Sequence, residues 1–106
     1  MPETYKILGK GTLVGTTGQM YSPATGVQAI VKEMTFLPSP TTTPTTFSVS
    51  AGAAPAKTMI PTTPLGVSEW AEWQGAMALG PGDALSLTVL ASTAIDYIVS
   101  GVEITP

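Results

Sequence analysis

Apolar and polar residues alternate most regularly near the C-terminal end of the chain. Odd-numbered positions are apolar from residue 85 to 89 and again from 95 to 99, and most residues between them are small or polar. A period of two is typical of a β-strand with one buried face. Turn-forming residues precede the first run at 80–83, and small residues separate the two runs at 91–93. We therefore predict a β-hairpin in this part of the chain.

The alternation changes phase twice. Beyond residue 99 the apolar positions become even, which predicts a β-bulge at Ser100–Gly101, because glycine tolerates the backbone of a bulge best. Within residues 27–37, apolar residues at positions 27, 29 and 31 are followed by apolar residues of the opposite parity at 34 and 36, so we predict a second slip across Lys32–Glu33. This spacing would also suit a helix, but the β-branched residues and the terminating Pro38 favour a strand.

Shorter apolar runs at residues 5–14, 47–51, 58–60 and 67–73 complete the pattern. Among these shorter runs, residues 67–73 are the one place where a helix is conceivable, because about two turns would fit. We prefer a strand there as well. We expect one domain over residues 1–106, folded as an all-β antiparallel sandwich of seven or eight short strands, Ig-like or jelly-roll-like in connectivity. The predicted core consists of Val31, Met34, Phe36, Leu85, Leu87, Val89, Ile95, Tyr97 and Val99.

Residues 38–46 read PSPTTTPTT, a composition that cannot pack a core. Proline favours an extended backbone in such a segment. Two interpretations stay open: a Pro/Thr-rich surface loop, or an extended arm that lies on a neighbouring subunit.

The composition indicates assembly with other subunits. Hydrophobic residues make up 43% of the chain and charged residues 10%, against roughly 25% charged residues in an average soluble domain. So few charges leave apolar surface uncovered, and we expect other subunits to cover part of it, in a homo-oligomer or a larger assembly. The alternative is a monomeric sandwich coated with threonine and serine.

The same composition excludes several classes of function. A net charge of −3, with four lysines and no arginine, does not provide the basic face that nucleic-acid binding needs. Without histidine or cysteine, ordinary zinc sites, thiol nucleophiles and imidazole-dependent triads are excluded. No run approaches the about 18 apolar residues of a membrane-spanning helix, and the N-terminal residues do not resemble a signal peptide. We expect neither nucleic acid nor a membrane as a partner.

Acidic side chains are the remaining candidates for chemistry. Two carboxylates flanking a cleft suffice for glycoside hydrolysis, and carboxylates also bind calcium. No spacing in the sequence pairs them or matches a calcium loop, so we expect no enzymatic activity, no metal and no cofactor. We expect Asp83 to bond to the backbone of its own turn instead. The acidic residues considered are Glu69, Glu72, Asp83, Asp96 and Glu103.

The two tryptophans, Trp70 and Trp73, are three positions apart, so on a strand they would point to opposite faces. One would join the core. The other would lie on the surface, where it could anchor a protein contact or stack against a sugar. The shortage of charge favours the protein contact. We therefore predict an interface that contains the exposed one of Trp70 and Trp73 together with the 38–46 segment, so that the candidate residues are Trp70, Trp73, Pro38, Pro40 and Pro44.

Several segments resemble small virion proteins of tailed bacteriophages. The front half contains LGKGTL, then Tyr21-Ser22-Pro23, then AIVKEMTFL. The second half is more similar, with TPLGVSEWAEWQGAMALGPGDALSLTV followed by IDYIVSGVEI. The resemblance spans nearly the whole chain, apart from residues 38–46, and it rests on turns and alternation rather than on reactive residues.

The resemblance implies a non-enzymatic structural protein of the virion, assembled in the host cytoplasm. Its partners would be other virion proteins, such as the major capsid protein or tail proteins. We expect a capsid decoration (cement) protein that stabilises the shell through subunit contacts. The alternative is a tail-associated module that binds a carbohydrate or a receptor.

Overall fold

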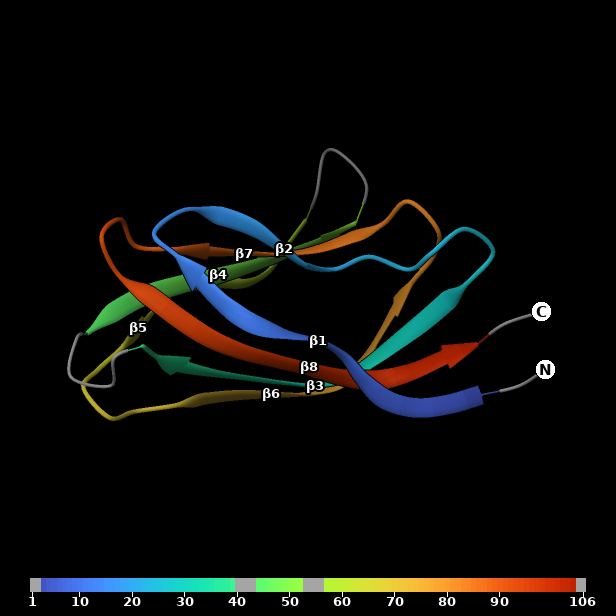
Figure 1. Cartoon of the computed structure of the whole chain (residues 1–106), viewed down its shortest axis with the longest axis horizontal. Helices are drawn as coiled ribbons and strands as arrows, with labels where there is room; N and C mark the ends of the chain where they lie inside the picture. Colours follow the sequence, from blue (N-terminus) through green and yellow to red (C-terminus); the bar gives the residue numbers. More distant parts are fainter. Residues whose placement is uncertain (1–2, 40–43, 53–56, 105–106) are drawn as a thin grey trace.

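The computed structural model describes residues 3–39, 44–52 and 57–104, and their regular structure is entirely β (Figure 1). The predicted all-β fold is thus confirmed. No helix that could cross a membrane is present in the described part of the chain. The strands are β1 (Glu3–Val14), β2 (Thr17–Tyr21), β3 (Gln28–Pro38), β4 (Thr45–Gly52), β5 (Lys57–Leu65), β6 (Ala71–Leu79), β7 (Ala84–Val89) and β8 (Ala94–Ile104).

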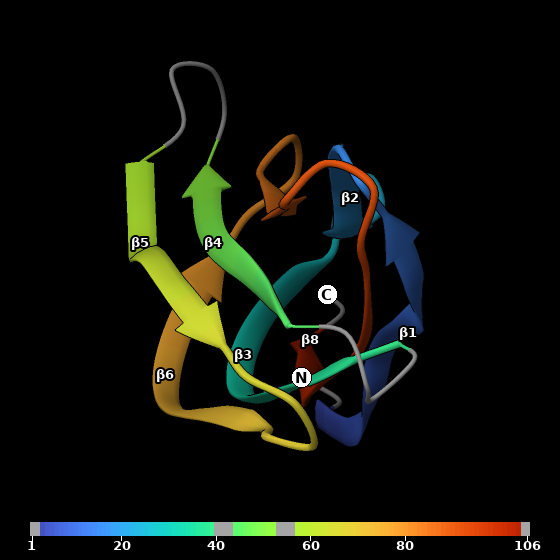
Figure 2. The same ribbon diagram turned by 90° about the vertical axis from the view of Figure 1, so that its left-hand side faces the viewer.

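The strands form two four-stranded antiparallel sheets that pack as a sandwich (Figure 2). Sheet A has the order β1-β8-β3-β6 and sheet B the order β2-β7-β4-β5. Consecutive strands lie in different sheets, except β4 and β5. This is the connectivity of an eight-stranded jelly roll. The first and last strands pair antiparallel in sheet A, with Glu3 opposite Ile104, so the start of β1 and the end of β8 lie at the same end of the sandwich (Figure 1).

The C-terminal strands do not form the predicted hairpin. β7 belongs to sheet B and β8 to sheet A, and the turn between them crosses from one layer to the other. Alternate residues of both strands are buried, as predicted. The two sets of buried residues belong to opposite sheets, however, and both face the core between the sheets. Alternation shows that a strand has a buried face, but not which strand lies beside it.

The core lies between the sheets. Of the nine predicted core residues, eight are fully buried, and Tyr97 is partly buried against them. Phe36 of sheet A stacks on Phe47 of sheet B, with ring centroids 4.7 Å apart, so the two layers meet directly. The alternation prediction left out several core residues, among them Met20, Phe47, Leu65, Met77 and Leu79.

The slip predicted in β3 is confirmed. The register of β3 breaks between Val31 and Glu33 against both neighbouring strands. Against β8 the additional residue is Lys32, whereas against β6 the additional residue lies in β6, between Gln74 and Met77.

The bulge predicted at Ser100–Gly101 is wrong, because β8 pairs without interruption through Gly101 and Val102. The additional residues lie in the two flanking strands instead, at Leu8 in β1 and Lys32 in β3. The apolar even positions after residue 99 therefore mark a second apolar face of β8, not a change of phase.

Residues 66–70 form a turn rather than the first part of a strand. Glu69 N donates to Gly66 O (3.1 Å), Gly66 N donates to Glu69 Oε1 (2.7 Å), and Ser68 has a φ of 58°. β6 therefore begins only at Ala71.

Candidate functional site

The outer face of sheet A carries a row of apolar side chains that crosses all four strands. Strand register pairs Ile30 with both Ala78 and Val102, and Val102 with Tyr5. The sequence neighbours of Ile30 and Ala78 are buried in the core, so these side chains, and those paired with them across the sheet, point away from it. Tyr5 is 63% exposed. We call this set the apolar row; it consists of Tyr5, Val102, Ile30 and Ala78.

A second row crosses the same face further along the strands. Ile98, which is 45% exposed, pairs with Lys10 on one side and with Thr35 on the other, and Thr35 pairs with Glu72. This row therefore has a lysine on one edge strand of the sheet and a glutamate on the other. We call it the charged row; it consists of Lys10, Ile98, Thr35 and Glu72.

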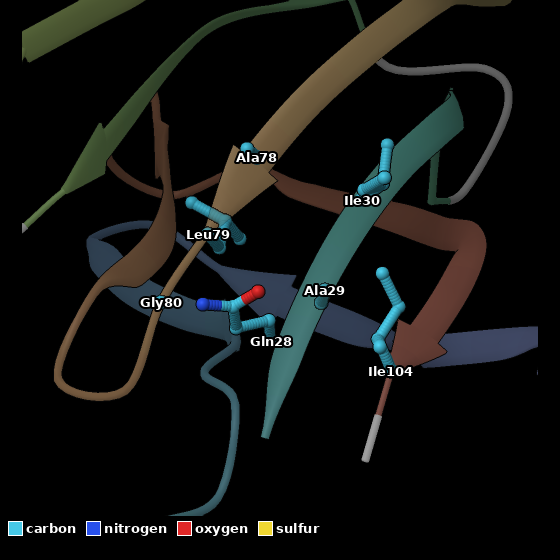
Figure 3. A pocket seen from close by; sticks show the side chains of 7 residues that line it. All are labelled: Gln28, Ala29, Ile30, Ala78, Leu79, Gly80 and Ile104. Carbon is cyan, nitrogen blue, oxygen red and sulfur yellow. The ribbon is translucent and has the colours of Figure 1, made fainter. Parts of the chain in front are cut away.

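A shallow hollow of about 210 Å³ adjoins the apolar row where β3 begins and β6 ends (Figure 3). Its seven lining residues carry no charge. Such a hollow is suited to an apolar or aromatic side chain rather than to catalysis. It is lined by Gln28, Ala29, Ile30, Ala78, Leu79, Gly80 and Ile104.

The outer face of sheet B is polar and uncharged over β2, β7 and β4. Thr17 and Thr88, which pair across β2 and β7, have hydroxyl oxygens 2.9 Å apart. A hollow of about 290 Å³ lies where β4, β5 and β7 meet, beside Thr46, Ser48 and Thr62. The outward side chains of β2, β4 and β7 include Thr17, Gln19, Thr46, Ser48, Ser50, Ser86 and Thr88.

The residues predicted as an interface do not share one surface. Trp70 is 64% exposed in the turn before β6, whereas Trp73 is partly buried against the core. Pro38 is fully buried, so its side chain is not available to a partner, but Pro44 is exposed. Pro40 lies outside the described residues. Pro44 and Trp70 lie at the same end of the sandwich, because Phe36, near the end of β3, pairs with Ala71, and Thr45 pairs with Leu65.

The acidic residues are dispersed over the molecule. Asp83 Oδ2 accepts a hydrogen bond from Gly80 N (2.9 Å), which confirms its predicted role in its own turn. Glu69 organises the turn at Gly66 in the same way, and Asp96 accepts a hydrogen bond from Thr12 on the outer face of sheet A. In the described part of the chain, no three acidic side chains gather closely enough to hold a metal ion.

Glu103 joins three strands at the end of the sandwich where the chain begins and ends. Tyr21 Oη of β2 donates to Glu103 Oε2 (2.7 Å), and Lys6 Nζ of β1 lies 2.6 Å from Glu103 Oε1. The hydrogen bonds from Lys6 and Tyr21 hold the pKa of Glu103 below its usual value. Burial, with the nearby carboxylate, raises the pKa of Tyr21 far above its usual value. The cluster ties sheet A to sheet B and leaves Glu103 ionised at neutral pH.

We did not find the apolar row in the sequence, because we interpreted the even-numbered apolar positions after residue 99 as the sign of a β-bulge. The signal was nevertheless present: Val102 and Ile104 follow Ile98 at even positions, while the odd positions of the same strand fill the core. Apolar residues on both faces of a strand are typical of strands that are covered on both sides.

No protein-family model and no curated protein sequence matches the chain. Among solved structures, a chain in the acidic stable capsid structure of Helicobacter pylori bacteriophage KHP30 is similar over 99% of this chain and 98% of its own, with a TM-score of 0.56 and 12% identity. A xylan-binding domain from Paenibacillus barcinonensis is similar over 94% and 80%, with a TM-score of 0.46 and 10% identity. The first similarity shows a shared fold across the whole chain, and the second is too distant to support a conclusion.

Proposed function

We propose that the protein is a non-enzymatic structural component of a bacteriophage virion, and specifically a capsid decoration protein. The observation that carries this proposal is the number of large apolar side chains on the surface of a chain with little charge. These residues, between 43% and 66% exposed, are Tyr5, Ile7, Val14, Met59, Val67, Trp70, Leu90 and Ile98. The whole-length similarity in fold to a chain of a phage capsid structure supports it.

A decoration protein stabilises a shell by linkage, because it binds the assembled shell and not its dissociated parts. Trp70 is suited to such a contact, since exposed tryptophan frequently dominates the binding energy of protein interfaces. Pro44 lies at the same end and adds a rigid apolar side chain. We therefore propose that this end of the sandwich faces the shell.

Electron microscopy of intact particles of the phage that encodes the chain tests this proposal. We expect density for the protein on the head, at a copy number comparable to that of the major capsid protein. Particles that lack it should release their genome at a lower temperature. Location on the tail, at a low copy number, would contradict the proposal.

The contact with the shell is tested by Trp70→Ala and Pro44→Ala, which should lower the occupancy of particles. Deletion of residues 38–46 is unsuitable, because it removes the buried Pro38 and Thr45 together with the exposed Pro44. Trp70→Phe is the matched control, since it retains an aromatic ring.

The alternative function is a tail-associated module that binds a carbohydrate or a receptor. The hollow on sheet B favours it, because hydroxyl-bearing residues, among them Thr46, Ser48 and Thr62, make up half of its lining. Titration of the purified protein with host surface polysaccharide, compared with Ser48→Ala, tests this alternative. Binding that the variant abolishes would support it.

A further inference from the structure

We propose that two copies of this chain pair face to face through the outer face of sheet A. The two-fold axis would run along the strands, between β8 and β3. This inference does not depend on a role in the virion. It rests on three features of the face: its size, the position of the hollow and the charges at its edges.

The face is large enough for a stable dimer. Four strands about 4.8 Å apart, each about 11 residues long at about 3.3 Å per residue, cover roughly 700 Å². A standard protein interface buries about 800 Å² per partner. Two sheets also pack well with their strands nearly aligned, at about 30°.

The proposed axis places apolar side chains on apolar side chains. It exchanges β8 with β3, so Val102 of one copy would lie over Ile30 of the partner subunit. It also exchanges the edge strands β1 and β6, so Tyr5 would lie over Ala78 of the partner subunit. Ala78 lines the hollow (Figure 3), and the hollow of one copy would therefore receive the exposed ring of Tyr5 from the other.

The same axis pairs opposite charges. Lys10 and Glu72 occupy the two ends of the charged row, on β1 and β6. Exchange of the edge strands brings Lys10 of each copy opposite Glu72 of the other, at two symmetry-related places. Charged groups at the rim of an interface fix the orientation of the partners more than they add affinity. Two further acidic residues of this face, Glu33 and Asp96, would lie opposite Ser100 and Leu37 of the partner subunit and meet no cation there. The edge charges alone therefore favour this two-fold axis over one that runs across the strands.

Sedimentation velocity of the purified full chain over a range of concentrations tests the dimer. We expect a species of twice the 10.8 kDa mass of the chain. Val102→Lys should raise the dissociation constant at least about tenfold, because it places a charge within the apolar row of the contact. The matched control is Thr88→Lys on the outer face of sheet B, which should change the constant by less than about twofold.

Charge reversal tests the axis without affecting the core, because Lys10 and Glu72 are both exposed. Lys10→Glu or Glu72→Lys alone should weaken the dimer by about three- to tenfold, since like charges then meet twice. The double variant should return to within about twofold of the parent protein. Thermal melting followed by circular dichroism verifies that each variant is folded.

Three results would overturn the proposal. The first is a protein that stays monomeric up to about 1 mM. The second is an equal effect of Val102→Lys and Thr88→Lys. The third is a double charge reversal that binds more weakly than either single variant.

Discussion

The outer faces of the two sheets differ, although both sheets contribute equally to one core. Across sheet A, tyrosine, valine, isoleucine and alanine form a continuous apolar row. At the corresponding face of sheet B the cross-strand row is Gln19, Ser86, Ser50 and Thr58. The outer face of sheet A also carries charges, among them Lys10, Glu33 and Glu72, whereas the row of sheet B is uncharged. The contrast is between the apolar row and the hydrogen-bonding row at the corresponding place on sheet B.

This difference is not required by the fold. β-Branched residues favour strands whether they end in a methyl group, as in valine, or in a hydroxyl group, as in threonine. Sheet B shows that threonine and serine suffice for an outer face in this jelly roll. Single apolar residues on a surface need no explanation, but a row across four strands does. The apolar row is therefore better explained by association than by folding.

The largest effect is expected from Gly101→Val, which would disturb the strand that carries the apolar row. A Cβ atom at Gly101 would lie 2.1 Å from Ile30 O and 3.0 Å from Val31 Cα, both on the neighbouring strand β3. Because these are backbone atoms in a sheet, β8 and β3 would have to separate. We expect the free energy of unfolding to fall by about 1–3 kcal/mol, measured by chemical denaturation.

Ser100→Val is the matched control, because Ser100 is the preceding residue of the same strand and points to the outer face. It introduces the same side chain without the close contact, so its stability should stay within about 0.5 kcal/mol of the parent protein. Equal effects of the two substitutions would show that the close approach at Gly101 is not the cause.

Much of the inner face could be predicted from the sequence. Alternation of apolar residues identified Leu85, Leu87 and Ile95, because a buried strand face leaves a period-two pattern in the chain. Neighbouring strands could not be identified in this way. In this jelly roll, β7 and β8 follow one another in sequence but lie in opposite sheets. Apolar and polar residues alternate in the same way in both sheets, so the alternation does not show to which sheet a strand belongs.

The candidate site was harder to predict, since it depends on strand register. Tyr5, Ile30, Ala78 and Val102 are far apart in sequence, and only the order β1-β8-β3-β6 brings them into one row. Trp70 could be singled out by residue type alone, but its exposure follows from the turn at 66–70, which the apolar pattern did not indicate. Pro38 shows the opposite failure: a proline-rich composition indicated a surface position, whereas the end of β3 buries this residue.

A smaller effect is expected from Glu103→Gln, which tests how the two sheets are held together at the end near the chain termini. The carboxylate pairs with Lys6 and accepts a hydrogen bond from Tyr21. Lys6 is half exposed, so solvent screens the ion pair, and we expect a loss of roughly 0.5–1 kcal/mol at pH 7. Differential scanning calorimetry of both proteins measures it.

The pH dependence of that loss has a definite sign. The pKa of Glu103 is lowered in the folded protein, so its contribution is fully present above the unfolded value, near 4.3, and disappears as the pH falls through the lower folded value. The parent protein and Glu103→Gln should therefore converge in stability below about pH 4. Tyr21→Phe removes only the hydrogen bond and should lose less than Glu103→Gln. A difference in stability that grows on acidification would contradict this account.

Replacing polar residues by apolar residues on the outer face of sheet B should change the stability of the protein less than it changes its self-association. Ser50 and Ser86 pair directly across β4 and β7 and point outward. Replacing both by valine retains or improves strand propensity, so the free energy of unfolding should stay within about 0.5 kcal/mol of the parent protein. The same change creates an apolar patch, and we expect larger species in sedimentation velocity. Ser50→Thr with Ser86→Thr is the control for shape, and it should not associate further.

The smallest effect is expected from salt, and its direction separates an apolar contact from an electrostatic one. The Debye length falls from about 10 Å at 0.1 M to about 3 Å at 1 M, so sodium chloride over this range screens the Lys10–Glu72 pairs. It does not weaken the burial of Tyr5, Ile30 and Val102, because apolar burial carries no charge. The dissociation constant of the dimer should therefore change by less than about twofold.

Lys10→Glu should respond in the opposite sense and bind more tightly at high salt, because screening relieves the repulsion between like charges. Sedimentation velocity of both proteins at the two salt concentrations measures this. If the parent dimer weakened about tenfold or more, charges would dominate its interface, and the contrast between the two outer faces would not explain association.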